Sequence, residues 1–144
     1  MGKDNYDIFK EKLLMDIFNQ IPNESVLAMD VLMNDDFLGS DTFRLLQNYR
    51  IYDSVVGDCI HPSCYFLVKK EYLPVYKYAI ESELPAYLCH YMIYSNDMSG
   101  HEILVTVYDS CIFNISRKII IDDDLISNCE SEGIYINKMD FILS

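Results

Sequence analysis

Hydrophobic and polar positions alternate most regularly between residues 102 and 121. In the run 102–108 apolar side chains fall at every second position, and the run 111–116 repeats the pattern. Successive side chains of an extended strand point to opposite faces, so these runs predict two strands, each with one apolar face. Only Asp109 and Ser110 separate them, which predicts a β-hairpin, although this pair lacks the glycine that a two-residue turn prefers.

The first third of the chain has a helical pattern instead. Apolar residues three and four positions apart predict a helix over 4–21, which a proline then ends. A second helix is expected to begin at a cap formed by Asn23 or Ser25 and to continue through Met33. The polar residues Asn34, Asp35 and Asp36, together with Gly39, predict a loop after it.

Strands and helices alternate in the middle of the chain. Ser40 or Asp41 is expected to cap a third helix. The run 51–56 predicts a weak strand, and the run 64–68 predicts a clearer one. Residues 71–83 have a helical pattern with a proline in the first turn, where proline is tolerated.

The C-terminal half begins with an ambiguous run, 85–95, whose tyrosines fit a helical face while its apolar residues also alternate. We favour a strand, because the central hairpin needs a neighbour to be stable. A short helix or turn over 125–132, closed by Gly133, and a last strand over 134–143 follow. With no repeat or linker, residues 1–144 are expected to form a single α+β domain, with N-terminal helices packed on a mainly antiparallel C-terminal sheet.

The charge balance is strongly acidic. The 144 residues include 23 Asp and Glu against 11 Lys and Arg, a formal net charge of −12. Such a surface repels phosphate backbones and anionic lipids, which argues against direct binding to nucleic acid or to a membrane. It would speed association with a basic protein, although an acidic surface also serves solubility alone. The 12 tyrosines are suited to half-buried positions and to contact surfaces.

Targeting signals and cysteine usage point to a cytoplasmic protein. The N-terminal residues lack the apolar core of a signal peptide, and Tyr6 stands where a myristoylation signal needs Ser or Thr. The longest uncharged run, 84–96, is too short to span a bilayer as a helix. Five cysteines at irregular spacing in a chain without an export signal are typical of reduced thiols.

Candidate metal and thiol chemistry is confined to two places. The segment Cys59-Ile-His-Pro-Ser-Cys64, supplemented by Cys89-His90, contains zinc-ligand residue types, but the spacing matches no common zinc module. A thiol nucleophile paired with His61, His90 or His101 is the other reading, although nothing in the sequence holds a base against a thiol. No glycine-rich phosphate loop is present. The sequence therefore predicts no cofactor, metal site or catalytic residue.

The acidic residues are segregated along the chain. Residues 13–43 contain six acids and no Lys or Arg, and residues 119–144 contain six acids and one lysine. If these segments lie near one another after folding, they would give one or two acidic faces. Three adjacent aspartates could also meet a cation, but an EF-hand pattern is absent. The residues predicted to bind a partner are Asp35, Asp36, Asp41, Asp122, Asp123, Asp124, Glu130 and Glu132.

In size, acidity, free thiols and lack of a catalytic motif, the chain resembles the small cytosolic immunity proteins of bacterial toxin–immunity pairs, including those of contact-dependent growth inhibition. The resemblance covers overall character and assigns no individual residue. It implies a cytoplasmic inhibitor that binds a basic protein, such as a nuclease toxin, with carboxylates in place of phosphates and tyrosines in apolar contact. Two alternatives stay open, a small Cys/His-dependent enzyme and a viral or phage interaction module that mimics nucleic-acid charge.

Overall fold

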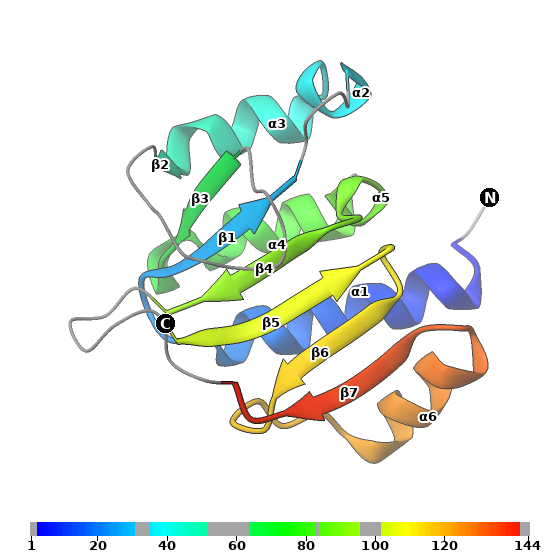
Figure 1. Ribbon diagram of the computed structural model, residues 1–144. Coiled ribbons are helices and arrows are strands. Elements are labelled where there is room, and N and C mark those ends of the chain that lie inside the picture. The colour runs from blue at the N-terminus through cyan, green and yellow to red at the C-terminus, as the bar shows by residue number, and fades with distance from the viewer. Residues whose placement is uncertain (1–2, 31–34, 52–63, 83, 96–101, 142–144) are drawn as a thin grey trace.

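One mixed sheet organises the protein. The computed structural model describes residues 3–30, 35–51, 64–82, 84–95 and 102–141 (Figure 1). Within them a seven-stranded sheet has the order β2-β3-β1-β4-β5-β6-β7, and neighbours are antiparallel except β6 and β7, which are parallel. The strands are β1 (Ser25–Met29), β2 (Arg50–Ile51), β3 (Cys64–Val68), β4 (Tyr91–Tyr94), β5 (Ile103–Tyr108), β6 (Ile112–Ser116) and β7 (Tyr135–Met139).

Helices cover one face of this sheet, which confirms the predicted α+β class. Helices α1 and α4 lie behind the strands in Figure 1, α6 lies at the β7 edge, and α2 and α3 lie where β2 and β3 form the opposite edge. The helices are α1 (Asn5–Gln20), α2 (Asp35–Leu38), α3 (Asp41–Leu46), α4 (Leu73–Glu81), α5 (Leu84–Tyr87) and α6 (Asp123–Ser131), with 3-10 turns at Gln47–Tyr49 and Lys70–Tyr72.

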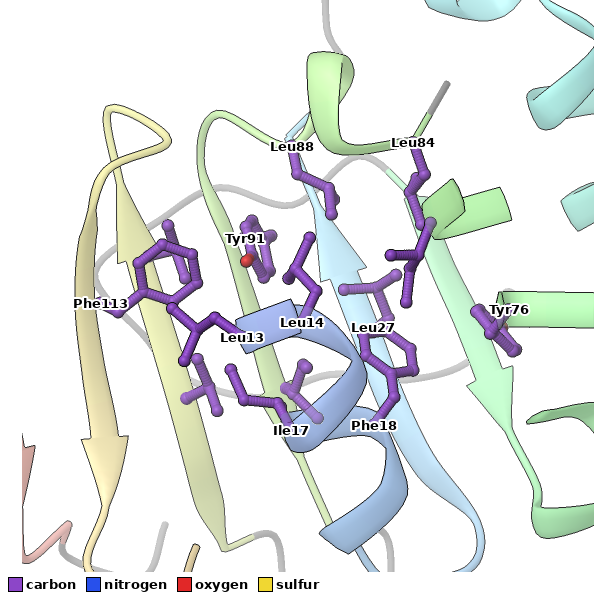
Figure 2. Close-up of a cluster of buried hydrophobic side chains, with 14 of the residues drawn as sticks. Leu13, Leu14, Ile17, Phe18, Leu27, Tyr76, Leu84, Leu88, Tyr91 and Phe113 are labelled. Atoms are coloured by element: carbon purple, nitrogen blue, oxygen red, sulfur yellow. The ribbon is translucent and has the colours of Figure 1, made fainter. Parts of the chain in front are cut away.

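The main core forms between α1 and the sheet. Figure 2 shows apolar side chains of α1 projecting onto strand residues from β1, β4 and β6. All of them are buried, and each contributes about 1.5–3 kcal/mol when removed from water. Helix α4 joins through Tyr76, whose ring lies 5.4 Å from Phe18 and whose hydroxyl donates to the Leu67 carbonyl at 2.8 Å. The residues of α1 that Figure 2 labels are Leu13, Leu14, Ile17 and Phe18, and they pack on the labelled strand residues Leu27, Tyr91 and Phe113.

The predicted hairpin is confirmed as β5 and β6. Asp109 and Ser110 both have left-handed backbone angles, with φ of 53° and 58°. Two such residues in succession fit a type I′ turn, whose twist matches that of the flanking strands. The turn is also tied to the preceding strand region, because the Ser110 amide donates to the Cys89 carbonyl at 2.8 Å. Asp and Ser therefore occupy the turn without the glycine that the pattern lacked.

The helix predicted from Ser25 to Met33 is wrong over its described part. Residues Ser25–Met29 form β1, which pairs with β3 on one side and β4 on the other. All five residues are buried, because a strand in the middle of the sheet is covered on both faces. Such a strand loses the alternation that marks a half-buried one, so its apolar run resembles a helix. Residues 31–34 lie outside the described part of the chain.

Other boundaries are partly confirmed. The first helix, the third helix with Ser40 as its cap, and the strand over 64–68 agree with the prediction. The helix over 71–83 is α4 preceded by a 3-10 turn. The loop predicted over 34–39 contains the single turn of α2. Of the weak strand over 51–56 only Ile51 is described, and it belongs to β2.

The last third follows the predicted order with two differences. The run 85–95 begins as the short helix α5 and becomes a strand only at β4, which does pair with β5 as the hairpin required. The last strand, β7, is parallel to β6 because α6 crosses between them. Gly133, with φ of 85°, follows α6 in the left-handed conformation that commonly ends a helix.

Candidate functional site

Gln20 connects the end of α1 to the segment that leads into α6. Its side-chain oxygen accepts from the Ile120 amide at 2.8 Å, and its side-chain nitrogen donates to the Ile120 carbonyl at 2.7 Å. The same nitrogen lies 3.2 Å from the carbonyl of Asp16, one helical turn earlier. This pair of hydrogen bonds fixes residue 120 against α1, and Asp122 follows two residues later.

Helix α6 packs on α1 through one apolar side. Leu125 and Cys129 are buried in the main core, and the Cys129 thiol faces the Phe9 carbonyl at 3.9 Å. Burial, and secondarily the carboxylate of Glu130, raises the pKa of Cys129 to about 11. This thiol is therefore protonated at neutral pH and serves as a packing group.

A groove of about 390 Å³ lies between α1 and α6. Its apolar lining comes from Phe9 and Met15 of α1 and Leu125 of α6. Four carboxylates and one ammonium complete the charged lining, with Asn128 as the remaining polar group. We call this feature the acidic groove, and its charged residues are Glu11, Lys12, Asp16, Asp122 and Asp124.

Three of the four groove carboxylates form no ion pair within the described part of the chain. Glu11 forms an ion pair with Lys3, which leaves Asp16, Asp122 and Asp124 without an ion-pair partner among the described residues. Lys12 lies over the Phe9 ring, 5.9 Å from its centroid. The groove thus has an apolar wall and a net negative charge, which suits the methylene stem and the charged head of a lysine or arginine side chain.

The predicted residues near α6 fall into two groups. Asp122, Asp123 and Asp124 are all exposed at the start of α6, where the helix dipole favours negative charge. Asp122 and Asp124 line the acidic groove and Asp123 does not. Glu130 and Glu132 lie at the other end of the helix, about 12 Å away at 1.5 Å per residue.

The remaining predicted residues lie on the opposite side of the molecule. Asp35 and Asp36 begin α2, and Asp41 begins α3, where it forms an ion pair with Arg44. Six strand spacings separate the β2 and β7 edges, about 29 Å at 4.8 Å each. Asp36 and Asp41 therefore lie on a separate face from the acidic groove. The groove itself joins one acid of the first acidic segment, Asp16, to Asp122 and Asp124 of the second.

The sequence missed the contribution of α1 to this groove. Asp16 was only one of many acids in the first segment, and Glu11 was not singled out. Both flank the buried stripe that contains Leu13 and Ile17, so helical spacing alone indicates which side of α1 they occupy. Their approach to α6 depends on where the chain crosses from β6 to β7, far from α1 in the sequence, and the local sequence of α1 has no signal for this.

The predicted metal and thiol residues do not form a cluster where they are described. Cys59, His61 and His101 lie outside the described residues, and Cys64 is buried within β3. His90 is held by Asp109, whose carboxylate lies 3.6 Å from Nε2 and whose amide donates to Nδ1 at 3.4 Å. Across the described ranges, no group of three or more His, Cys, Asp and Glu side chains could hold a metal ion.

No family model, curated protein or solved structure matches this chain. None of the helices in the described ranges is both long enough and apolar enough to span a bilayer.

Proposed function

We propose that this protein is a cytoplasmic binding protein of the immunity type, which binds and neutralises a basic protein such as a nuclease toxin. The observation that carries the proposal is the acidic groove, where Asp16, Asp122 and Asp124 lie beside an apolar wall and form no ion pair with any residue that the structure describes. A solvated charge that serves solubility alone has no need of a groove or of adjacent apolar surface. This arrangement suits an inserted cationic side chain.

Binding would proceed in two stages. The net charge of −12 would draw a basic protein towards the acidic surfaces and raise the association rate. An arginine or lysine of the partner would then enter the acidic groove, with its stem against Met15 and Leu125 and its head between the carboxylates. A toxin whose phosphate-binding residues are occupied in this way could not bind its nucleic acid, and no catalytic residue or cofactor is needed.

The test is charge reversal in the acidic groove. The double variant Asp122→Lys/Asp124→Lys should lower the affinity for the protein encoded by the adjacent reading frame by about 100-fold, since each lost or repelled ion pair at an interface costs at least about 1.4 kcal/mol. The matched control is Asp36→Lys/Asp41→Lys, which changes net charge equally at the opposite edge. Titration calorimetry at two salt concentrations measures both, and circular dichroism verifies the fold.

The outcomes distinguish binding in the acidic groove from attraction by the net charge of the protein. Equal losses in both variants would show that net charge alone attracts the partner, and the acidic groove would have no special role. An adjacent protein that is acidic, or that binds with no salt dependence, would contradict the inhibitor proposal. A nucleic-acid charge mimic would use the same carboxylates, and would differ in binding many unrelated nucleic-acid-binding proteins.

A Cys/His enzyme is the second candidate, and the environment of Cys89 favours it. This thiol is exposed, and the next residue, His90, has its imidazole oriented by Asp109. In this candidate His90 acts as the base for the Cys89 thiol, so iodoacetamide should modify Cys89 more slowly in His90→Ala than in the native protein. Equal rates in the native protein and in His90→Ala would remove this candidate.

A further inference from the structure

A second hollow, of about 330 Å³, lies on the other side of α1. The first turns of α1, α5 and the turn between β5 and β6 lie at the same end of the sheet (Figure 1). Apolar contributions come from Tyr6, Ile80, Pro85 and Ala86. We call this hollow the lysine pocket, and its polar lining residues are Lys3, Asp7, Lys10, Glu11, Ser82 and Ser110.

Lys10 is the unusual member of this lining. Its side chain belongs to a residue that is only 4% exposed, although lysine is almost never buried without a charged partner. Nζ donates to the Pro85 carbonyl at 3.3 Å and lies 5.6 Å from the centre of the Tyr6 ring. No described carboxylate lies within ion-pair distance of it. One long hydrogen bond leaves most of its hydrogen-bonding capacity unused.

Burial makes the neutral amine of Lys10 easier to reach than that of an exposed lysine. Burial lowers the pKa of Lys10, and this effect outweighs the opposing influence of Cys89, Cys111 and Asp7. The neutral amine is the nucleophilic form, and a desolvated lysine in an apolar pocket is a recognised way to obtain it at moderate pH. Lys3 and Glu11 also line the pocket, but they are paired with each other.

The charge of the surroundings selects the class of ligand. A small anion would be attracted to Lys10, but the net charge of −12 and the carboxylate of Asp7 oppose its entry, while Lys3 and Glu11 neutralise each other. A neutral compound experiences neither effect, and the apolar lining favours one with an aromatic or aliphatic body. Among neutral compounds, an aldehyde or ketone is the class with which a primary amine reacts reversibly.

We propose that the lysine pocket captures a small neutral aldehyde or ketone as an imine on Nζ of Lys10. The amine nitrogen attacks the carbonyl carbon, and a C–N bond forms as the C=O π bond breaks to give a carbinolamine. Both protons of the attacking amine end on the carbonyl oxygen, which leaves as water when the C=N bond forms. The net change is amine plus carbonyl to imine plus water, with no oxidant or reductant.

Reductive trapping with benzaldehyde and sodium cyanoborohydride at pH 7.5 tests the proposal. The reagent reduces the imine to a stable benzylamine, so intact-mass spectrometry counts the adducts and peptide mapping locates them. We expect one dominant adduct, on Lys10, while exposed lysines such as Lys12 and Lys77 stay largely unmodified. Lys10→Arg keeps a cation but cannot form an imine, so it should lose this adduct entirely, and Lys12→Arg should retain it.

Three outcomes would overturn the proposal. Adducts spread evenly over the exposed lysines would show that Lys10 has no special reactivity. An unchanged adduct count in Lys10→Arg would place the reaction elsewhere. Protection from thermal unfolding by benzoate, combined with no trapping of benzaldehyde, would identify the pocket as an anion site. Peptide mapping of the unaltered protein decides the question even if the Lys10 variant fails to fold.

Discussion

The two hollows beside α1 share a helix and one lining residue, Glu11. They differ in whether their charged groups are exposed to water. In the acidic groove the carboxylates of Asp122 and Asp124 are exposed, so water solvates them and salt screens them. In the lysine pocket the ammonium of Lys10 is buried, so water stabilises it poorly and its neutral form gains. The acidic groove should therefore respond to salt, and the lysine pocket to pH.

One helix can serve both hollows because of its geometry. Lys10 and Lys12 are two residues apart, which places their side chains about 200° apart around the helix axis. Lys10 consequently faces the lysine pocket from the same side of the helix as the buried Leu13, Leu14 and Ile17, and Lys12 faces the acidic groove from the opposite side. The rigidity of α1 on the sheet is thus a condition for both sites.

Removing a core contact of α1 should have the largest effect. Leu14 is fully buried beneath the helix (Figure 2), and Leu14→Ala should lower the free energy of unfolding by about 2–5 kcal/mol through lost burial and a residual cavity. Urea denaturation measures this loss. Ile8→Ala on the same helix is the control, since Ile8 is 38% exposed and should cost under about 1 kcal/mol. Similar costs for the two variants would contradict the packing of α1 described above.

The next largest effect should come from removing the buried ammonium of Lys10, which has no counterpart in the acidic groove. Lys10→Met replaces the ammonium with an apolar group of similar length, and should raise the free energy of unfolding at pH 7 by about 1–2 kcal/mol, as often occurs when a poorly compensated buried charge is removed. A lowered pKa means that the unfolded chain binds the proton more tightly. The contribution of Lys10 to stability therefore rises with pH between its folded pKa and the unfolded value of 10.5.

Urea denaturation of both proteins at pH 7 and at pH 10.5, the upper end of that window, measures this pH dependence. The advantage of Lys10→Met over the unaltered protein should shrink at the higher pH. Cys129 and Tyr91, whose pKa values burial raises, are present in both proteins, so their titration cancels in the comparison. An advantage that grows with pH would mean that Lys10 is stabilised as an ammonium in the folded protein.

Local patterns predicted the parts of the fold that are amphipathic. The hairpin of β5 and β6 and the helix α1 each have one buried side, so the period of their apolar residues identified them. Strand β1 has two buried sides, and without alternation its sequence could not be distinguished from a helix. The parallel pairing of β7 with β6 depends on the path of the chain through α6, which apolar periodicity does not encode.

The acidic groove and the lysine pocket, like the fold, were predictable from the sequence only where the signal is local. Asp122 and Asp124 were identified from local charge, but their neighbour Asp16 comes from a helix more than 100 positions earlier in the chain. Lys10 did leave a local signal, since it is four residues from both Tyr6 and Leu14 and so occupies a position on the apolar side of α1. A lysine in that position usually extends its ammonium to solvent, and only the packing of α5 shows that it does not.

The smallest effect concerns the link that shapes the acidic groove. Gln20→Ala removes the two hydrogen bonds to Ile120, and because both are exposed the free energy of unfolding should fall by only about 1 kcal/mol. The consequence for binding should be larger than this value suggests, because Gln20 fixes the segment that carries Asp122. Affinity for the basic partner should fall about tenfold, while benzaldehyde trapping on Lys10 stays unchanged.

Asn19→Ala, at the exposed neighbouring position, is the control and should alter neither property. If Gln20→Ala weakened trapping and binding together, the two hollows would not be independent, and α1 would have to shift as a unit when its C-terminal contact is lost.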